Sequence, residues 1–366
     1  MSLTCGIVGL PNVGKSSLFN ALSNAGAEAA NFPFCTIDPN VGIVPVPDER
    51  LDHLAELVNP RQVTPTSIEF VDIAGLVKGA SEGKGKGNAF LSHIREVDLI
   101  IHVVRCFQDD DVVHVEGGID PVRDIGIIES ELLFKDLETL ERREERVKKM
   151  AKSGDKALQN QLYSLEQLRH HIEEGKPVRS YSGWDPANPA FQELFFLTAK
   201  KVLYLCNVSE DDLPEGEGNS YVMSVQEHAE KEGAETVVVC AKIEAEIAEL
   251  DEEEKREFLA SLNLKESGLK RLISAAYSKL GLITFFTAGP KEVRAWTITR
   301  GTKAPQAAGV IHSDFEKGFI RAETISFDDY SACKSEAAAR EAGKMRSEGR
   351  GYTVKDGDVI LFRFNV

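Results

Sequence analysis

Short apolar runs alternate with helix-periodic segments over the first two thirds of the chain. The runs are rich in Val and Ile, and two of them, residues 97–107 and 201–209, are mostly apolar. Continuously apolar strands separated by helices are typical of a parallel sheet covered on both faces. The pattern therefore predicts a doubly wound α/β domain whose strands include CGIVG, SIEFVDIAG, VDLIIHVVRCF, KVLYLCNVS and ETVVVCAKI.

A long charged insertion separates the third of these runs from the fourth. Its apolar residues recur mostly every three or four positions, as in an amphipathic helix, on both sides of the break KSGDK at 152–156. The spacing predicts a coiled-coil-like helical hairpin over about residues 125–180. Its charged outer faces fit a solvated surface or a partner-binding surface, and the pattern leaves both open. The apolar seam consists of Ile125, Ile128, Leu132, Leu137, Leu140, Val147, Leu158, Leu162, Leu165 and Ile172.

The pattern changes again near Gly281. Apolar and polar residues now alternate, as in RAWTI and DVILFRF, around one Ala-rich helical segment at 330–343. Alternation with Gly- and Asp-containing turns is typical of a small mixed sheet. We therefore expect residues 283–366 to form a separate α+β module, after a nucleotide-binding domain that spans residues 1–282.

Composition narrows the class of protein. The chain has 366 residues, 42% of them hydrophobic and 28% charged, and carries a net charge of −16. No apolar run approaches the roughly 20 residues that span a bilayer, and the scattered cysteines form no C-x-x-C pair, so a cytoplasmic protein with reduced thiols and no membrane contact is expected. From residue 284 to the end, 13 Lys or Arg stand against 11 Asp or Glu. An acidic body with a slightly basic C-terminal module places any RNA contact on that module.

The segment 9–16, GLPNVGKS, matches G-x-x-x-x-G-K-[ST] between a predicted strand and a predicted helix. The backbone N–H groups of such a loop surround a β-phosphate, and the positive end of the following helix adds to the attraction. In this arrangement Lys15 bridges the β- and γ-phosphates and Ser16 holds Mg²⁺. The predicted phosphate-contacting residues are Asn12, Val13, Gly14, Lys15, Ser16 and Ser17.

Two further segments complete the predicted phosphate site. Asp72 ends the run SIEFVD, where its carboxylate is expected to reach Mg²⁺, and the Gly75 N–H is expected to face the γ-phosphate. Thr36, between the two motifs, is the candidate for a second hydroxyl ligand of Mg²⁺. Glycines at 75, 79, 83, 85 and 87 give the following segment the backbone freedom of a nucleotide switch.

Together these motifs resemble those of the Obg-like ATPases of the YchF subfamily. The similarity is carried by residues 6–52, by FVDIAGLVKGASEGKGKGN at 70–88 and by HVVRCF at 102–107, and Lys86 departs from it where an apolar residue is expected. It extends over nearly the whole chain. The resemblance implies an Obg-type P-loop NTPase domain with a helical hairpin insertion, followed by a TGS domain of β-grasp shape.

The resemblance also implies a choice of base. GTPases read guanine with Asn-Lys-x-Asp, in which the carboxylate accepts two hydrogen bonds and the Lys stem stacks on the ring. This chain has Asn207-Val208-Ser209-Glu210, so the stacking Lys is absent and the carboxylate is displaced by one methylene. The family implies that Asn207 and the Val208 backbone hold adenine, while Cys240-Ala241-Lys242 closes over the base. A degenerate loop that accepts both ATP and GTP stays open as an alternative.

Hydrolysis is expected to be slow, because Leu76 occupies the position where efficient GTPases carry a water-orienting Gln. Among the candidate histidines, His102 lies within an apolar strand and His93 on a helix after the switch, so we assign the catalytic role to His114, with a structural loop histidine as the alternative. Asn12 resembles the potassium-coordinating Asn of other GTPases that lack the Gln. Its role in binding K⁺ is left open beside a role in bracing the loop.

The resemblance implies a regulatory ATPase that acts on the ribosome. The expected contact is RNA phosphate on the TGS domain, where Arg340, Lys344, Arg346 and Arg350 fall within eleven residues. The helical hairpin is a second candidate surface. A nucleotide-gated adaptor for a protein partner is one alternative function, and a metabolic kinase is another.

Overall fold

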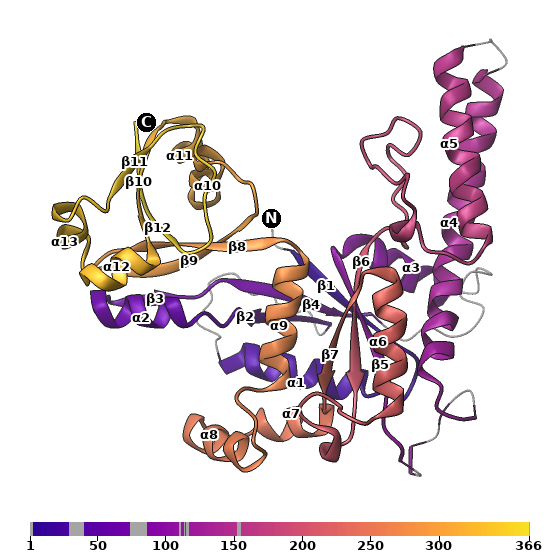
Figure 1. The fold of residues 1–366 in the computed structure, drawn as a ribbon, viewed down its shortest axis with the longest axis horizontal. Helices are drawn as coiled ribbons and strands as arrows, with labels where there is room; N and C mark the ends of the chain where they lie inside the picture. The colour runs from indigo at the N-terminus through magenta and orange to yellow at the C-terminus, as the bar shows by residue number, and fades with distance from the viewer. Residues whose placement is uncertain are drawn as a thin grey trace. The chain divides into compact units, whose positions relative to one another are not determined.

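The computed structural model describes residues 3–28, 40–73, 86–109, 111–112, 114, 117–151 and 155–365 (Figure 1). The chain divides into two compact units. Unit 1 comprises Met1–Val44 and Glu69–Leu272, and unit 2 comprises Pro45–Ile68 and Ile273–Val366. Thr36 and Gly75, two of the predicted site residues, lie outside the described residues.

Unit 1 is built on a six-stranded sheet in the order β2-β4-β1-β5-β6-β7. The pairs β1–β4, β1–β5, β5–β6 and β6–β7 are parallel, and every residue of β5 is buried, which confirms the doubly wound arrangement. Consecutive strands leave β1 on opposite sides, so the carboxyl end of β1 lies at a topological switch point, where open α/β sheets bind ligands. The strands are β1 (Thr4–Val8), β2 (Val41–Pro45), β4 (Ser67–Asp72), β5 (Leu99–Arg105), β6 (Lys201–Asn207) and β7 (Glu235–Val239).

Helices connect these strands. Residue types that favour helix N-termini cap two of these helices. Asn219 accepts hydrogen bonds from the first turn of α6, and Asp251 forms a capping box with Glu254 at the start of α8. The helices of this part are α1 (Lys15–Glu28), α3 (Lys86–Glu96), α6 (Ser220–Glu232), α7 (Ala241–Ile247), α8 (Glu252–Ser261) and α9 (Gly268–Lys279), with short 3₁₀ helices η2 (Val178–Ser180) and η3 (Glu210–Asp212).

The predicted helical hairpin is present as α4 (Pro121–Ala151) and α5 (Lys156–Glu173) (Figure 1). Leu140, Val147 and Leu165 are buried between the two helices, as the seam predicts, and Leu168, which was not in the predicted seam, is buried with them. The segment that leads from α5 back to the sheet adds Val178, Ala190, Phe191 and Phe196 to the same apolar cluster. Within the described residues no helix combines the length and the apolar character needed to cross a bilayer, and this includes α4 with its 31 residues.

Asp136 attaches this returning segment to α4. The carboxylate is 1% exposed and accepts hydrogen bonds from the Leu197 N–H at 2.7 Å, the Thr198 N–H at 2.8 Å and the Thr198 hydroxyl at 2.7 Å. Burial raises the pKa of Asp136 to about 6, against the opposing effect of these three donors. The buried carboxylate thus satisfies two backbone N–H groups that otherwise have no acceptor inside the hairpin cluster.

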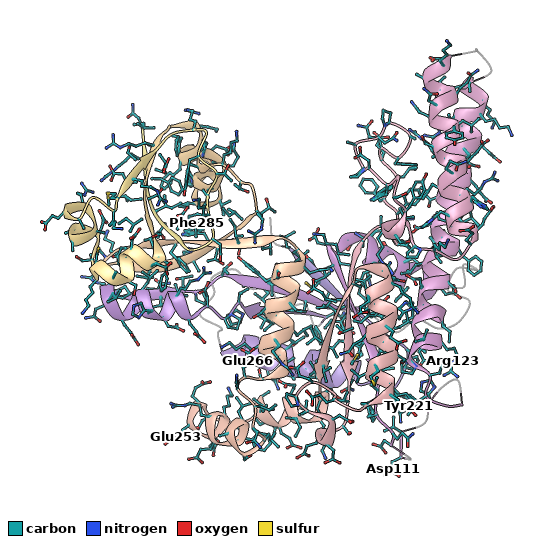
Figure 2. All side chains as sticks on the ribbon, viewed as in Figure 1. Asp111, Arg123, Tyr221, Glu253, Glu266 and Phe285 are labelled. Atoms are coloured by element: carbon teal, nitrogen blue, oxygen red, sulfur yellow. The ribbon has the colours of Figure 1, made fainter. Side chains whose placement is uncertain are left out.

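Unit 2 is a mixed sheet in the order β11-β10-β12-β8-β9-β3, with helices on both faces. The last strand, β12, runs parallel to β8 at the centre, and Phe285 of β8 lies in the core (Figure 2). The elements of the C-terminal part are β8 (Leu282–Ala288), β9 (Glu292–Thr299), α10 (Ala304–Ile311), α11 (Ser313–Lys317), β10 (Phe319–Ser326), α12 (Phe327–Cys333), α13 (Glu336–Glu341), β11 (Arg346–Glu348) and β12 (Asp358–Phe364). The predicted α+β architecture is confirmed.

Unit 2 also includes residues 45–68, which the sequence pattern assigned to the nucleotide-binding domain. β3 (Gln62–Thr64) pairs in parallel with β9, and α2 (Glu49–Val58) buries Leu51 and Leu54 against Phe286 and Val293. Without α2, one face of the C-terminal sheet would expose these apolar side chains to water. The module of residues 283–366 therefore completes its core with an earlier piece of the chain.

We predict that Asp136→Asn removes a pH dependence of stability. The folded-state pKa of Asp136 is raised from 3.8 to about 6, so folding favours the neutral acid, and the stability that this group contributes falls as pH rises through that interval. The unfolding free energy of the wild-type protein minus that of the variant should therefore decrease between pH about 4 and about 6 in urea titrations. A difference that increases with pH would mean that the three donors stabilise the carboxylate more than burial destabilises it.

Candidate functional site

The loop between β1 and α1 has the backbone shape that the phosphate-binding motif requires. Asn12 and Gly14 have φ values of 63° and 93°, both in the left-handed region. A Cβ atom at Gly14 would lie 2.2 Å from Nδ2 of Asn207, so only glycine fits there. The Leu18 N–H donates to the Gly14 carbonyl at 3.1 Å, which closes the first turn of α1 directly behind the loop.

Asn207, at the end of β6, braces this loop from the side. Its Nδ2 donates to the Val13 carbonyl at 2.9 Å, and its Oδ1 accepts from the Ala241 N–H at 2.9 Å. The residue is 4% exposed, so both hydrogen bonds are shielded from water. One side chain thereby links the loop, β6 and the start of α7. The sequence predicted that Asn207 contacts a base, but did not anticipate this bracing role.

Val208 and Glu210 follow directly. The Val208 N–H donates to the Val239 carbonyl at 2.9 Å and its side chain is 2% exposed, so its backbone N–H is already used by the sheet. Glu210 begins η3 and lines a cavity of about 780 Å³. The cavity is lined by Asn12, Gly14, Ser17, Phe107, Gln108, Asp109, Val112, Asn207, Val208, Ser209, Glu210, Asp211, Cys240, Ala241, Lys242, Ala245, Glu246 and Glu249.

A second hollow of about 470 Å³ lies over the loop and is lined by Leu10, Pro11, Asn12, Gly14, Lys15, Ser16 and Ser17. The two cavities share Asn12, Gly14 and Ser17. A hollow over the phosphate-binding loop, next to a larger one at the strand ends, is the arrangement expected of a phosphate site beside a base site. Figure 2 shows Asp111 and Tyr221 at the end of unit 1 toward which β6 and β7 run.

Lys15 lies between the loop and the end of β4. Its Nζ donates to Asp72 Oδ1 at 3.1 Å and to the Ile73 carbonyl at 3.0 Å. The structure thus brings together Lys15, Ser16 and Asp72, as predicted. Hydroxyl and carboxylate oxygens are hard donors that suit Mg²⁺, so Ser16 and Asp72 fit that ion.

Arg105, the last residue of β5, has a role at this site that the sequence pattern did not predict. Its guanidinium is 2% exposed and donates to the carbonyls of Phe107 at 3.2 Å, Val112 at 2.9 Å and Asp109 at 3.1 Å. It also lies 4.6 Å from the centre of the Phe107 ring. All three acceptors belong to residues that line the larger cavity, so Arg105 fixes part of the wall of that cavity. The sequence feature that could have indicated this role is an arginine at the end of an otherwise mostly apolar strand.

His114 lies elsewhere. Its Nε2 is 2.8 Å from Asp124 Oδ2 in the first turn of α4, and both side chains are almost fully buried. Arg123 donates to the other oxygen of Asp124 at 2.9 Å and to the Gly118 carbonyl at 2.6 Å. Neither cavity described above is lined by His114. The structure therefore does not bring His114 to the loop with Lys15.

Of the two other candidate histidines, His102 is a buried residue of the sheet. His102 is 6% exposed within β5, and its ring centre is 5.7 Å from that of Tyr204. Burial, with the nearby charge of Arg179, lowers the pKa of His102 to about 3, so the imidazole is neutral at physiological pH. This agrees with the prediction that His102 is a core residue.

Two family models match the chain. Residues 4–150 match MMR_HSR1, described as a 50S ribosome-binding GTPase. Residues 282–365 match YchF-GTPase_C, described as a protein of unknown function (DUF933).

Full-length relatives are similar throughout. The "Ribosome-binding ATPase YchF" of Bacillus subtilis (strain 168) is 58% identical over 366 residues, with 100% of both chains covered. The "Obg-like ATPase 1" of Pongo abelii is 48% identical over 369 residues, covering 100% of this chain and 93% of that protein. Among solved structures, the Schizosaccharomyces pombe YchF GTPase is 40% identical and superposes with a TM-score of 0.89 over 99% of this chain and 98% of its own.

We predict that Arg105→Lys weakens nucleotide binding about tenfold, or about 1.4 kcal/mol. Lysine keeps the positive charge but lacks the planar fork that reaches all three carbonyls, so Phe107, Asp109 and Val112 lose their shared donor. Titration with a fluorescent nucleotide should show the higher dissociation constant, with a smaller change in turnover at saturation. Arg300→Lys, at an exposed position, is the matched control. An unchanged dissociation constant in Arg105→Lys would show that the cavity wall does not depend on Arg105.

Proposed function

The chain belongs to the YchF family of Obg-like ATPases, and from this membership we propose that it binds ATP, hydrolyses it slowly and associates with the ribosome. The single observation that carries the nucleotide part is the pair of adjoining cavities, one over the phosphate-binding loop and one at Asn207–Glu210. Relatives of 58% and 57% identity are named ribosome-binding ATPases, which supports the reaction and the partner.

The phosphates bind against the loop 9–14 and the first turn of α1. Lys15 moves from Asp72 to the β- and γ-phosphates, where its charge offsets the charge that develops during transfer. Asn12, Val13, Gly14, Ser16 and Ser17 complete this subsite. Ser16 and Thr36, with Asp72, would hold Mg²⁺, which would neutralise phosphate charge there, and the Gly75 N–H would face the γ-phosphate.

The base enters the larger cavity beside Asn207, Val208 and Glu210. ATP is preferred because the residue types that clamp guanine are absent here: the stacking Lys is replaced by Val208, and Glu210 is longer than the Asp that GTPases use. Asn207 already donates to Val13 and accepts from Ala241, so it holds adenine through the remaining amide hydrogen and lone pair. A GTPase would need in this place one carboxylate that accepts from both guanine N1–H and the 2-amino group.

Hydrolysis proceeds without a Gln after Asp-x-x-Gly, so the basal rate is slow. His114 is proposed to orient the attacking water, which requires it to leave Asp124 and approach the γ-phosphate. Asn12 is proposed to coordinate K⁺ beside the phosphates, where a monovalent cation supplies the charge of an arginine finger. The protein acts in the cytoplasm, where ATP and ribosomes are available, and contacts the ribosome through its TGS domain, with the helical hairpin as a second surface.

We predict that ATP binds more tightly than GTP. Non-hydrolysable analogues of both nucleotides, titrated by calorimetry, should differ in dissociation constant by about tenfold or more, because a buried guanine donor left unpaired costs about 1–3 kcal/mol. Glu210→Asp combined with Val208→Lys should raise the affinity for GTP. Glu249→Asp, another carboxylate of the same cavity, is the control. Equal affinities in the wild-type protein would refute ATP preference.

We predict that His114→Ala lowers ATP turnover about a hundredfold, a typical loss for a proton-transfer or water-orienting group, with little change in ATP affinity. His170→Ala, at a side chain that is 75% exposed, should leave turnover unchanged. If His114 only braces the first turn of α4, His114→Ala and Asp124→Asn should instead lower the thermal midpoint alike and retain turnover.

A further inference from the structure

Three arginines from separate segments converge on one carboxylate in unit 2. Glu323, in β10, accepts hydrogen bonds at Oε1 from Arg321 at 2.9 and 3.3 Å. Its Oε2 accepts from Arg363 in β12 at 2.9 and 3.1 Å and from Arg340 in α13 at 3.5 Å. We refer to Arg321, Arg340 and Arg363 with Glu323 as the arginine cluster.

The register of the sheet places this cluster on an uncovered part of one face. Arg321 pairs directly with Arg363, and Glu323 pairs with Leu361, so the four side chains lie on the same face. Further along the same strands Ile325 and Val359 are buried beneath α2, α12 and α13. Leu361 is 39% exposed, which marks the place where the helical cover ends. The cluster therefore forms an open patch at the end of a buried face.

The pairing of Arg321 with Arg363 is unfavourable in itself, because like charges directly opposite each other destabilise a sheet. Glu323 compensates by accepting from both. Each guanidinium has five N–H donors, and one carboxylate cannot occupy all of them. The side chains of the three arginines are 49%, 53% and 45% exposed, while that of Glu323 is 9% exposed. Cationic donors thus face outward and the carboxylate lies beneath them.

The cations predicted from the sequence are engaged differently. Lys344 pairs with Asp329 at 3.0 Å, and Arg350 donates to the Phe319 carbonyl at 3.0 Å. Arg346 donates to Tyr352 and lies 3.4 Å from Asp358, which is 2% exposed. Reversing the charge of Arg346 would therefore disturb a buried carboxylate. Of the predicted group, only Arg340 belongs to the cluster, where it also bonds Glu336 at 3.2 Å.

We propose that the arginine cluster binds the phosphate backbone of ribosomal RNA, an inference that rests on the proposed ribosome association. A chain with a net charge of −16 is repelled by RNA at long range, so contact needs cations concentrated at one place. Guanidinium groups match phosphate oxygens in two-point geometry. Glu323 gathers three of them on a flat strand surface, and Leu361 between them offers an apolar contact to a ribose or base.

The test uses the full-length protein with Arg321, Glu323, Arg340 and Arg363 all changed to Gln. This neutral variant loses three positive charges and one negative charge, and it avoids leaving Glu323 buried without a partner. Lys291→Gln with Arg300→Gln removes the same net charge from two exposed positions in unit 2 and serves as the matched control. ATP turnover and the thermal midpoint establish that each variant is folded.

Binding is measured by co-sedimentation with intact ribosomes and by titration of deproteinised ribosomal RNA, over a salt series from about 50 to 200 mM KCl. Each lost phosphate contact should reduce the slope of log affinity against log salt by about 0.7 to 0.9. We expect the neutral variant to bind both probes about tenfold more weakly with a shallower slope, and the control to bind as the wild-type protein does. Glu323→Gln alone should bind more tightly, because it removes only the negative charge.

Several outcomes would overturn the inference. Equal binding of the neutral variant and the wild-type protein would do so, as would weaker binding by Glu323→Gln, which would indicate that the cluster only holds the sheet together. Loss of ribosome binding with unchanged binding to deproteinised RNA would assign the patch to an acidic ribosomal protein. If the wild-type protein does not sediment with ribosomes, the proposed function fails, and the RNA titration still decides whether the cluster binds phosphate.

Discussion

The nucleotide site depends on one buried amide. Asn207 donates to Val13 and accepts from Ala241, and it occupies the space that a side chain at Gly14 would need. These contacts set the distance between the phosphate-binding loop and the strand that ends at the base cavity. Because the amide is 4% exposed, losing either bond would leave a buried polar group unsatisfied, at a cost of about 1–3 kcal/mol. Asn207 therefore ties the phosphate-binding loop to the carboxyl end of β6 and to the first residue of α7.

The need to pair buried polar groups also determines how the rest of the site is built. Arg105 holds the carbonyls of Phe107, Asp109 and Val112, and Asn219 caps α6 while donating to the Cys106 carbonyl at 2.9 Å. Gln108 adds a hydrogen bond to the Tyr221 hydroxyl at 2.9 Å. Loops at the ends of parallel strands have few backbone partners of their own, so side chains from the strands and helices satisfy them. The base cavity is thus defined by residues that do not themselves need to contact the nucleotide.

Much of the architecture could be read from the sequence, because periodicity reports burial directly. The buried strand β5, the hairpin seam around Leu140 and the alternation in β9 and β12 all follow from it, and so do Lys15, Ser16 and Asp72 as neighbours. The placement of residues 45–68 in unit 2 could not be read, since α2 looks like any amphipathic helix and nothing local identifies the sheet that it covers. Arg105 and the arginine cluster were missed for a related reason. Their roles arise from strand register and from contacts between distant residues, such as Arg321 with Arg363.

A single helix connects the hairpin to the proposed catalytic machinery. In the first turn of α4, Asp124 contacts His114. Glu129, which follows in the same helix, pairs with Arg179. Arg179 also pairs with Glu232 at the end of α6 at 2.6 Å, and Tyr204 of β6 donates to the same carboxylate at 3.2 Å. A buried ion pair of this kind tolerates little displacement, because separating the charges leaves one of them unpaired in the interior. The stem of the hairpin is therefore fixed to α6 and to β6, whose last residue, Asn207, lines the larger cavity.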